Sequence, residues 1–204
     1  MHRGEDFSIL FGRNELMSSR VRGSEEALAT LACEHLKGQT KPRMLIGGLG
    51  MGFTLRAALN ALPPTATIIV AELVPKILAW AERPLAHLFG DSLSDPRLSV
   101  EVRDVHDCVD APGAGYDAIL LDVDNGPDGL IHAANDRLYG VRGLRAAASA
   151  LRPGGILAIW SAYPDTAFVG RLQRACFSVD ERRVRATGGR KGAHHIVWLA
   201  VKTG

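Results

Sequence analysis

The sequence has few of the features that mark secreted, disulfide-stabilised or metal-binding proteins. Its 204 residues include only three cysteines, which are widely spaced and form no Cys-x-x-Cys pair: Cys33, Cys108 and Cys176. An odd number of isolated cysteines does not make a disulfide framework, and without clustered Cys and His ligands no zinc site is expected. We therefore expect three reduced, mostly buried thiols and no bound metal ion.

Long apolar runs are also missing. No stretch approaches the roughly 20 apolar residues that cross a bilayer, and the first residues lack the apolar core of a signal peptide. We therefore expect a cytoplasmic protein without a membrane partner.

Strong net charge is absent as well, because 24 Lys and Arg residues are nearly balanced by 22 Asp and Glu residues. A net charge of +2 does not indicate nucleic acid as a partner. One local basic cluster is formed by Arg182, Arg183, Arg185, Arg190 and Lys191. Either it is the solvated surface of a hairpin or it binds an anion.

What the chain does have is a hydrophobic content of 47%, enough for one globular domain. Residues 7–11 and 15–18 flank Gly12-Arg13-Asn14 and predict a short β-hairpin. We therefore divide the chain into an N-terminal hairpin extension, 1–22, and a main domain, 23–204. The hairpin could form a flap over the site, or its exposed edge could pair with a second subunit in a homodimer.

Strand and helix patterns alternate through the main domain. A helix is predicted from Ser24 to Gly38, where Glu25 and Glu26 supply acidic side chains for the first turn. Further strands are predicted at 43–47, 67–72, 98–102, 117–122 and 155–160, and further helices at 53–62, 75–83, 137–151 and 165–175. Such alternation predicts a parallel sheet with helices on both faces.

The C-terminal part departs from this alternation. Two β-rich segments, 177–186 and 194–201, are joined by Thr-Gly-Gly-Arg-Lys-Gly and predict an antiparallel hairpin. The whole pattern indicates an α/β protein whose seven-stranded sheet is mostly parallel and ends in that hairpin. This pattern resembles the Rossmann-like fold of class I S-adenosylmethionine-dependent methyltransferases more than that of a dinucleotide dehydrogenase, because no room remains for a separate substrate domain.

The most informative stretch is 43–52, in which an apolar strand runs into Gly48-Leu-Gly-Met-Gly52. Glycines let the backbone turn sharply and approach a ligand, and the following helix points its N-terminal amides at that ligand. Glu72 ends the next predicted strand, roughly 20 residues later, where such folds hold the ribose hydroxyls of a nucleotide cofactor. Alternatively, Glu72 caps the helix that starts near Pro75.

On these residues the chain resembles the spermidine synthase-like (polyamine aminopropyltransferase) family. The resemblance rests on the glycine motif followed by Thr54-Leu55-Arg56, on Glu72, on Asp95-Pro96-Arg97 leading to Asp104, and on Tyr116-Asp-Ala-Ile-Leu-Leu-Asp122-Val-Asp124-Asn-Gly-Pro127. It implies that S-adenosylmethionine, or its decarboxylated form, is bound by Gly48, Gly50, Met51, Gly52, Glu72, Leu73, Asp104, Val105 and Asp122. Within that set, Asp104 and the Val105 amide would address the adenine.

The resemblance also implies chemistry for two acids. Asp122 follows a central strand and would take a proton from an amine acceptor or orient it, and Asp124 would be the second catalytic candidate. The plainer alternatives are that Asp122 caps its loop, that Asp124-Asn-Gly makes a turn and that Asp104 lies in a surface loop. The side chains that could line an acceptor pocket are Tyr139, Trp160, Ser161 and Tyr163, although Trp160 also suits the core, and both His194 and His195 are interpreted as structural.

Two departures from the family pattern bear on function. Met51 stands where the resemblance places an aspartate that neutralises the amine of decarboxylated S-adenosylmethionine, and the second acid of the family's Asp-x-x-Asp-Pro motif is displaced to Asp124 or replaced by Asn125. A neutral side chain at 51 tolerates the carboxylate of ordinary S-adenosylmethionine, which an aspartate would repel.

We therefore predict a methyltransferase acting on a small or amine-type acceptor, with S-adenosylmethionine as cofactor and a small molecule as partner. The first alternative is a polyamine aminopropyltransferase that uses decarboxylated S-adenosylmethionine. A non-catalytic nucleoside-binding protein is an alternative from another class. A dinucleotide oxidoreductase is the least favoured, because of the terminal hairpin.

Overall fold

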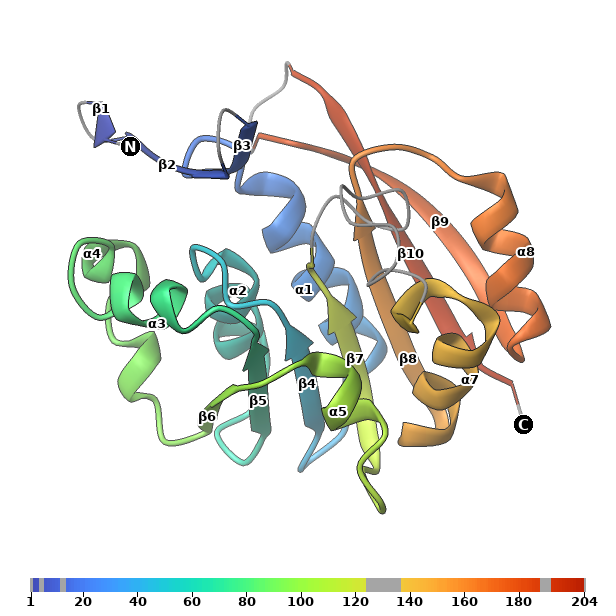
Figure 1. Ribbon diagram of the computed structural model, residues 1–204. Helices are drawn as coiled ribbons and strands as arrows, with labels where there is room; N and C mark the ends of the chain where they lie inside the picture. The colour runs from blue at the N-terminus through green and yellow to red at the C-terminus, as the bar shows by residue number, and fades with distance from the viewer. Residues whose placement is uncertain (1, 4–5, 12–13, 124–136, 188–191, 204) are drawn as a thin grey trace.

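The computed structural model describes residues 2–3, 6–11, 14–123, 137–187 and 192–203, and its centre is a seven-stranded sheet (Figure 1). In spatial order the strands are β6 (Leu98–Val102), β5 (Thr67–Glu72), β4 (Arg43–Gly47), β7 (Tyr116–Leu121), β8 (Leu151–Ser161), β10 (His194–Lys202) and β9 (Phe177–Arg185). The first five are parallel, and β10 runs antiparallel to both β8 and β9. The predicted mostly parallel sheet with a C-terminal antiparallel hairpin is therefore confirmed.

The sheet is covered on both faces because its central strands are apolar on both sides. In β4, Met44 and Ile46 belong to one hydrophobic cluster and Leu45 to the other. The first cluster contains side chains of α1 (Gly23–His35), α2 (Phe53–Ala61), α3 (Pro75–Ala81) and α4 (Ala86–Phe89). The second contains side chains of α5 (Val105–Val109), α7 (Val141–Ala150) and α8 (Thr166–Arg174). A 3₁₀ turn, η1 (Ser92–Ser94), precedes β6. Strands with two buried faces are typical of parallel sheets between helices.

The predicted N-terminal hairpin is present and forms a separate three-stranded sheet from β1 (His2–Arg3), β2 (Asp6–Phe11) and β3 (Asn14–Ser18). It lies above the carboxyl ends of the parallel strands (Figure 1). Ile9 is buried in the first hydrophobic cluster, and the rings of Phe7 and His87 lie 4.9 Å apart. The Met17 sulfur faces the glycine loop, since a Cβ added at Gly50 would lie 3.4 Å from it.

One sequence expectation was wrong in detail, and the expectation of mostly buried thiols was confirmed. The helix predicted over 137–151 does not include Leu151, which pairs with Tyr116 and begins β8, so β8 is longer than the predicted strand 155–160. Leu151 continues the apolar face of α7, which is why periodicity alone assigns it to the helix. Of the three free thiols, Cys33 and Cys108 are buried as expected, but Cys176 is exposed.

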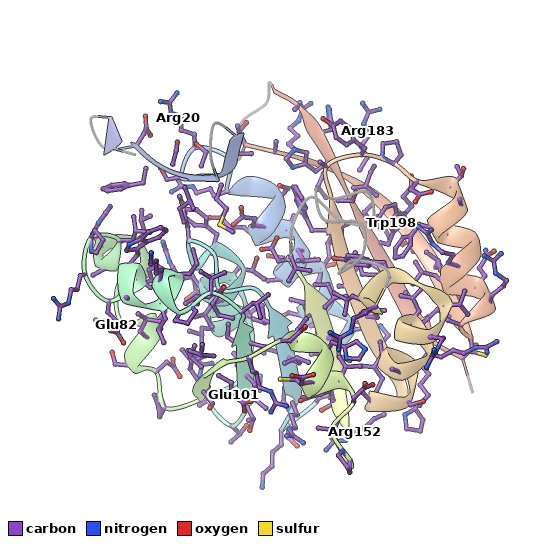
Figure 2. All side chains as sticks on the ribbon, viewed as in Figure 1. Arg20, Glu82, Glu101, Arg152, Arg183 and Trp198 are labelled. Atoms are coloured by element: carbon purple, nitrogen blue, oxygen red, sulfur yellow. The ribbon has the colours of Figure 1, made fainter. Side chains whose placement is uncertain are left out.

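The basic cluster is only partly described, because Arg190 and Lys191 lie outside the described residues. Arg182 and Arg183 are exposed on β9, and Arg182 pairs with Asp180 at 2.7 Å. Arg183 and Arg20 project from the same end of the molecule (Figure 2). Among the described helices, none is long and apolar enough to span a membrane.

Candidate functional site

The carboxyl ends of four neighbouring parallel strands gather most of the predicted site residues. The glycine loop follows β4, Glu72 ends β5, Asp104 comes after β6 and Asp122 comes directly after β7. Backbone hydrogen bonds fix the glycine loop to both neighbours: the Gly48 amide donates to the Ala71 carbonyl at 2.8 Å, and the Asp122 amide donates to the Gly47 carbonyl at 3.0 Å. In doubly wound sheets this edge is where ligands bind.

The Glu72 carboxylate holds the glycine loop in place. It is buried, its Oε2 accepts a hydrogen bond from the Leu49 amide at 2.9 Å, and its Oε1 accepts one from the Val74 amide at 2.8 Å. Val74 directly precedes α3, so the contact also orders the start of that helix, in line with the alternative interpretation. Because a carboxylate has about four acceptor positions, each oxygen can still accept from a ligand hydroxyl.

Glycine is required in the loop by the packing of the protein itself. Gly48 and Gly52 have φ values of +91° and +80°, in the left-handed region. A Cβ at Gly48 would overlap the Asp122 carbonyl oxygen, and one at Gly52 would overlap the Phe89 ring. The loop therefore brings the backbone close to Asp122, and it leads into the amino end of α2.

The structure buries the side chain of Met51, one of the predicted cofactor-binding residues. Its exposed fraction is only 2%, and it packs in the first hydrophobic cluster. Only the Met51 backbone is left to approach a ligand. Met51→Asp would consequently bury a charge in the core, and any loss of cofactor binding in that variant would not report on charge at the cofactor.

The surroundings of Asp122 fix the orientation of its carboxylate and raise its pKa. Its Oδ2 accepts a hydrogen bond of 2.6 Å from the Thr54 hydroxyl, at the start of α2. Burial raises the pKa of Asp122 from 3.8 to about 6, although the hydrogen bond from Thr54 opposes the rise. A carboxylate with such a pKa can take up a proton near neutral pH.

Glu25 lies near Asp122, which sequence reasoning did not anticipate. The same Thr54 hydroxyl lies 3.3 Å from the Glu25 carbonyl oxygen, so the first turn of α1 meets α2 and Asp122 at one point. The pKa of Glu25 is raised well above its usual range, first by burial and then by the negative charges of Asp122 and Glu26. In the sequence, Glu25 looks like an ordinary acid in a first helical turn, and nothing local signals its approach to a residue 97 positions later.

Of the two residues predicted to address the adenine, Asp104 and Val105, the first caps a helix and the second is buried. Asp104 is the N-cap of α5, and its Oδ1 accepts from the His106 amide at 2.9 Å. Val105 is buried beneath Gly47, so its amide alone could face a base. Leu73 is 66% exposed beside Glu72 and offers an apolar surface at the strand ends.

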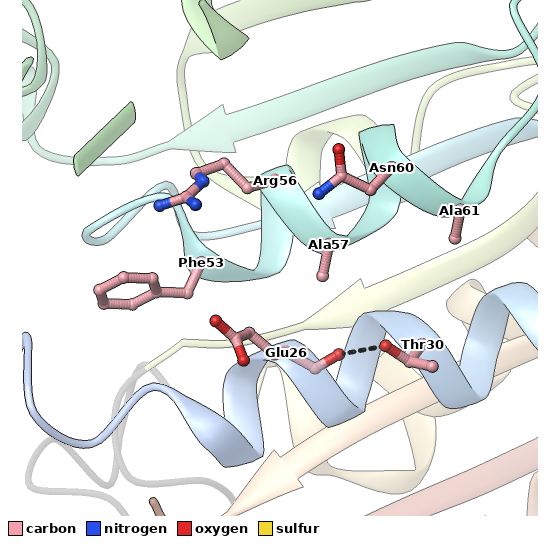
Figure 3. A pocket seen from close by; sticks show the side chains of 7 residues that line it. All are labelled: Glu26, Thr30, Phe53, Arg56, Ala57, Asn60 and Ala61. Carbon is pink, nitrogen blue, oxygen red and sulfur yellow. Dashed lines mark hydrogen bonds between the residues drawn. The ribbon is translucent and has the colours of Figure 1, made fainter. Parts of the chain in front are cut away.

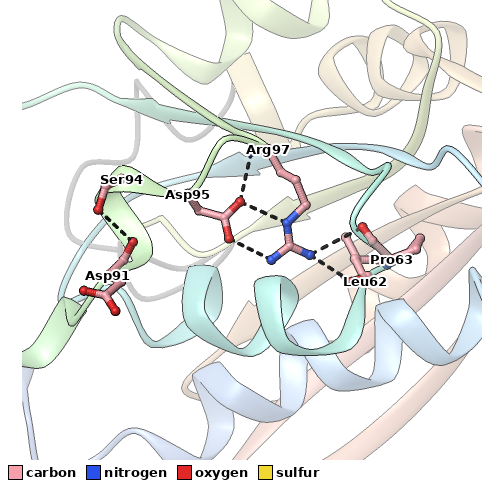
Figure 4. Close-up of polar contacts among 6 residues, drawn as sticks. All are labelled: Leu62, Pro63, Asp91, Ser94, Asp95 and Arg97. Carbon is pink, nitrogen blue, oxygen red and sulfur yellow. Dashed lines mark hydrogen bonds and ion pairs between the residues drawn. The ribbon is translucent and has the colours of Figure 1, made fainter.

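Asp95 and Arg97, part of the motif leading to Asp104, form a structural ion pair. Arg97 binds both carboxylate oxygens of Asp95, with Nε donating to Oδ1 at 2.9 Å and Nη2 donating to Oδ2 at 2.8 Å (Figure 4). Arg97 also donates to the carbonyl of Leu62 at the end of α2. The pair therefore fixes the loops before β5 and β6, because it ties one to the other.

The side chains proposed to line an acceptor pocket divide into two groups. Trp160 donates from Nε1 to the Ser24 hydroxyl at 3.0 Å, and Ser24 in turn lies 2.8 Å from Nδ1 of His195. This confirms a satisfied structural role for His195. Tyr163 is 69% exposed, whereas the buried Tyr139 hydroxyl donates to the Val123 carbonyl at 3.4 Å. Asp124 and Asn125 lie outside the described residues.

The molecule also has a surface groove that none of the predicted site residues lines. A groove of about 390 Å³ runs between α1 and α2 (Figure 3). It is lined by Glu26, Thr30, Phe53, Arg56, Ala57, Asn60 and Ala61. No predicted site residue lines this groove, so it is not assigned to the cofactor. The described residues contain no group of three or more His, Cys, Asp or Glu side chains that could hold a metal ion.

Comparison with known proteins supports the relationship indicated by the motifs. No family model matches the chain. Polyamine aminopropyltransferases of Mycobacterium tuberculosis and Mycobacterium bovis are 31% identical to it over 124 residues, which is 59% of this chain and 23% of theirs. Over this stretch the chain is similar to polyamine aminopropyltransferases. It spans about a quarter of the length of these curated relatives.

Solved structures show that the chain shares its fold with spermidine synthase and with several methyltransferases. Spermidine synthase from Thermotoga maritima matches with a TM-score of 0.69 at 17% identity, covering 93% of this chain and 63% of that one. Human methyltransferase-like protein 13, in complex with SAH, gives 0.62 at 22% identity and covers 89% and 80%. TrmN from Thermus thermophilus gives 0.59 at 25% identity and covers 88% and 48%.

Proposed function

We propose that the protein is an S-adenosylmethionine-dependent methyltransferase that acts on a small amine acceptor. The observation that carries the proposal is the arrangement of Glu72, the glycine loop and Asp122 at adjacent strand ends. In this proposal Glu72 accepts hydrogen bonds from the ribose hydroxyls, and the glycine loop lies against the methionine part of the cofactor. Two of the solved relatives contain SAM or SAH, which supports this class of cofactor.

Methyl transfer from a sulfonium is an in-line displacement, so much of its acceleration comes from holding the acceptor about 3 Å from the methyl carbon. The acceptor nitrogen must be unprotonated to attack. Asp122, with a pKa of about 6, is suited to accept the proton that the amine loses. The Thr54 hydroxyl fixes the orientation of that carboxylate.

The choice of methyl over aminopropyl transfer rests on position 51. Met51 is neutral and buried, so its side chain supplies no negative charge to pair with the amine of decarboxylated S-adenosylmethionine. Aminopropyl transfer remains the second candidate, because the curated relatives are named polyamine aminopropyltransferases.

The product identifies the reaction. With S-adenosylmethionine and an amine, methyl transfer yields S-adenosylhomocysteine, whereas aminopropyl transfer from the decarboxylated form yields methylthioadenosine. We expect the protein to form S-adenosylhomocysteine when both cofactors are offered together with a mixture of small amines, as measured by mass spectrometry. Methylthioadenosine as the sole nucleoside product would replace the proposal with the second candidate.

A further inference from the structure

The C-terminal hairpin carries cationic side chains on one face of its last paired residues. Arg183 and Arg185 are exposed on β9, and since alternate residues of a strand share a face, they lie on the same face as Val179 of the second hydrophobic cluster. His194 lies directly opposite Arg185 on β10. We call these three residues, Arg183, Arg185 and His194, the basic strip.

The charges of the two arginines in the basic strip are not neutralised by carboxylates. Within the described part of the chain, neither Arg183 nor Arg185 has an acidic partner, whereas Arg182, on the opposite face of β9, pairs with Asp180 at 2.7 Å. Partial burial lowers the pKa of His194, and the charges of both arginines lower it further. The small net charge of +2 therefore coexists with a local excess of positive charge, which attracts anions.

The basic strip lies at the same edge of the sheet as Asp122. Arg183 is paired in register with Ile196 on β10, and Ile196 is paired with Ser161, the last residue of β8. Figure 2 shows Arg183 at the end of the sheet where the parallel strands finish in Figure 1. Three strand spacings, roughly 14 Å, separate β9 from β7. A ligand that reaches from the strip to Asp122 is therefore longer than a small anion.

An exposed aromatic ring lies near the basic strip on a fixed stretch of backbone. The Tyr163 side chain is 69% exposed. Its backbone is held by the buried Ser161 hydroxyl, which donates to the Tyr163 carbonyl at 2.8 Å and accepts from the Tyr163 amide at 3.3 Å. Because Ser161 is in register with Arg183 across β10, this backbone lies about two strand spacings, roughly 10 Å, from Arg183.

We propose that the basic strip and Tyr163 bind a single-stranded nucleic acid at the edge of the proposed active site. Guanidinium groups bind phosphate oxygens through paired hydrogen bonds. Arg183 and Arg185, two residues apart on a strand, are about 7 Å apart, which is comparable with the separation of consecutive phosphates in an extended nucleic-acid strand. Tyr163 supplies a flat surface on which an unpaired base stacks.

The combination of charge and aromatic ring favours this partner over other anions. An acidic peptide or an anionic membrane would pair with the arginines but would give the Tyr163 ring no flat partner. In a duplex the bases are already stacked on one another, so an exposed ring suits a single strand. The inference goes beyond the proposed function and does not depend on it, because it concerns binding and not transfer.

Fluorescence anisotropy with a labelled single-stranded decanucleotide, as RNA and as DNA, tests the role of the arginines. At about 50 mM salt, Arg183→Gln and Arg185→Gln should each weaken binding by about fivefold to tenfold. The slope of log K against log salt should become shallower by about 0.7 for each arginine removed, because one phosphate contact releases fewer counterions.

Arg182→Gln is the matched control, because it removes the same charge from the adjacent residue, which lies on the opposite face of β9 and is paired with Asp180. Its affinity should stay within about twofold of wild type. If Arg182→Gln loses as much affinity as Arg183→Gln, binding depends on total charge and the proposed strip is wrong.

Substitutions of Tyr163 test the stacking contact separately. Tyr163→Ala should weaken binding by about fivefold or more without changing the salt slope, because stacking releases no counterions. Tyr163→Phe keeps the ring and should bind as wild type does. Equal affinity of Tyr163→Ala and wild type would remove the base-stacking part of the inference.

Wild-type protein alone gives a readout that does not depend on how well a variant folds. Its salt slope should be about −1.4 or steeper, as expected when two arginines contact two phosphates of a single strand. No binding of either decanucleotide at low salt, or displacement of the decanucleotide by polyglutamate or by phosphatidylserine vesicles at equal charge, would overturn the inference. The assay contains no cofactor, so failure to bind S-adenosylmethionine would contradict the proposed function and leave this result intact.

Discussion

At the scale of single residues, Asp122 connects structure and chemistry. Its carboxylate is held by Thr54, lies beside the backbone of Gly48 and has a pKa raised by burial to about 6. The folded protein therefore maintains an acid that is poised to exchange a proton near neutral pH. Such a group costs stability whenever it is ionised, and this cost is typical of functional sites.

The pH dependence of stability tests that description. The folded pKa of Asp122, about 6, exceeds its ordinary value of 3.8, so between these values the folded state holds a proton that the unfolded state has released. Stability should fall as pH rises through this window and stay lower above it. In Asp122→Asn that fall should be smaller, because only Glu25 still contributes to it, and without the Asp122 charge it contributes less.

Urea denaturation of both proteins at a series of pH values measures the difference. We expect Asp122→Asn to gain stability relative to the parent as pH rises from 3.8 to about 6 and to keep that gain at higher pH, while its methyl transfer falls. Parallel stability curves for the two proteins would show that the Asp122 pKa is not raised by folding.

At the scale of elements, the turn from β4 to α2 is the part of the fold that the site requires most strictly. Glu72 holds the turn through the Leu49 amide, and the turn packs directly against the backbone of Asp122. The turn could be identified from the sequence because glycine spacing is a local feature. Its contacts with Met17 and Phe89 could not, since they come from elements remote in the chain.

Replacement of Gly48 by alanine should show how strict this turn is. Gly38 is a suitable control, because its φ is +92° and a Cβ there would meet nothing within 4 Å, whereas Gly48 has a φ of +91° and a backbone oxygen in the way. Both substitutions carry the left-handed strain of about 1–2 kcal/mol. Gly48→Ala should cost at least about 1 kcal/mol more, for overpacking, and should abolish cofactor binding.

Chemical denaturation and cofactor titration of the two variants provide the comparison. Gly38→Ala should bind the cofactor as the parent does. If the two variants lose equal stability, or if Gly48→Ala still binds the cofactor normally, the close approach of the loop to Asp122 is not a requirement of the site.

At the scale of the whole molecule, the sequence was sufficient for the architecture and insufficient for the site. Alternating apolar segments predict the parallel sheet, and the 177–201 region predicts the hairpin, because both depend on local periodicity. The site needs contacts between distant segments. Glu25 reaches Asp122 because α1 and α2 pack together, and the Met51 side chain is buried in the first hydrophobic cluster. Side-chain direction at a turn is not encoded in spacing, so the burial of the Met51 side chain could not be predicted.

The N-terminal sheet contacts both the hydrophobic core and the glycine loop. Ile9 is buried in the core and Met17 faces the glycine loop, so this sheet lies over the same edge as the proposed cofactor site. The prediction that it forms a flap over the site stays a prediction, and the contact between Met17 and the loop supports it.

The most direct test of the proposed methyl transfer is calorimetric titration of the protein with S-adenosylmethionine and, separately, with its decarboxylated form. We predict tighter binding of S-adenosylmethionine, because the neutral, buried Met51 supplies no charge for the amine of the decarboxylated cofactor. Glu72→Gln should weaken binding of both, since the glutamine oxygen can accept from only one of the two amides, Leu49 and Val74, that the Glu72 carboxylate holds. Tighter binding of the decarboxylated form would contradict the account and favour polyamine synthesis.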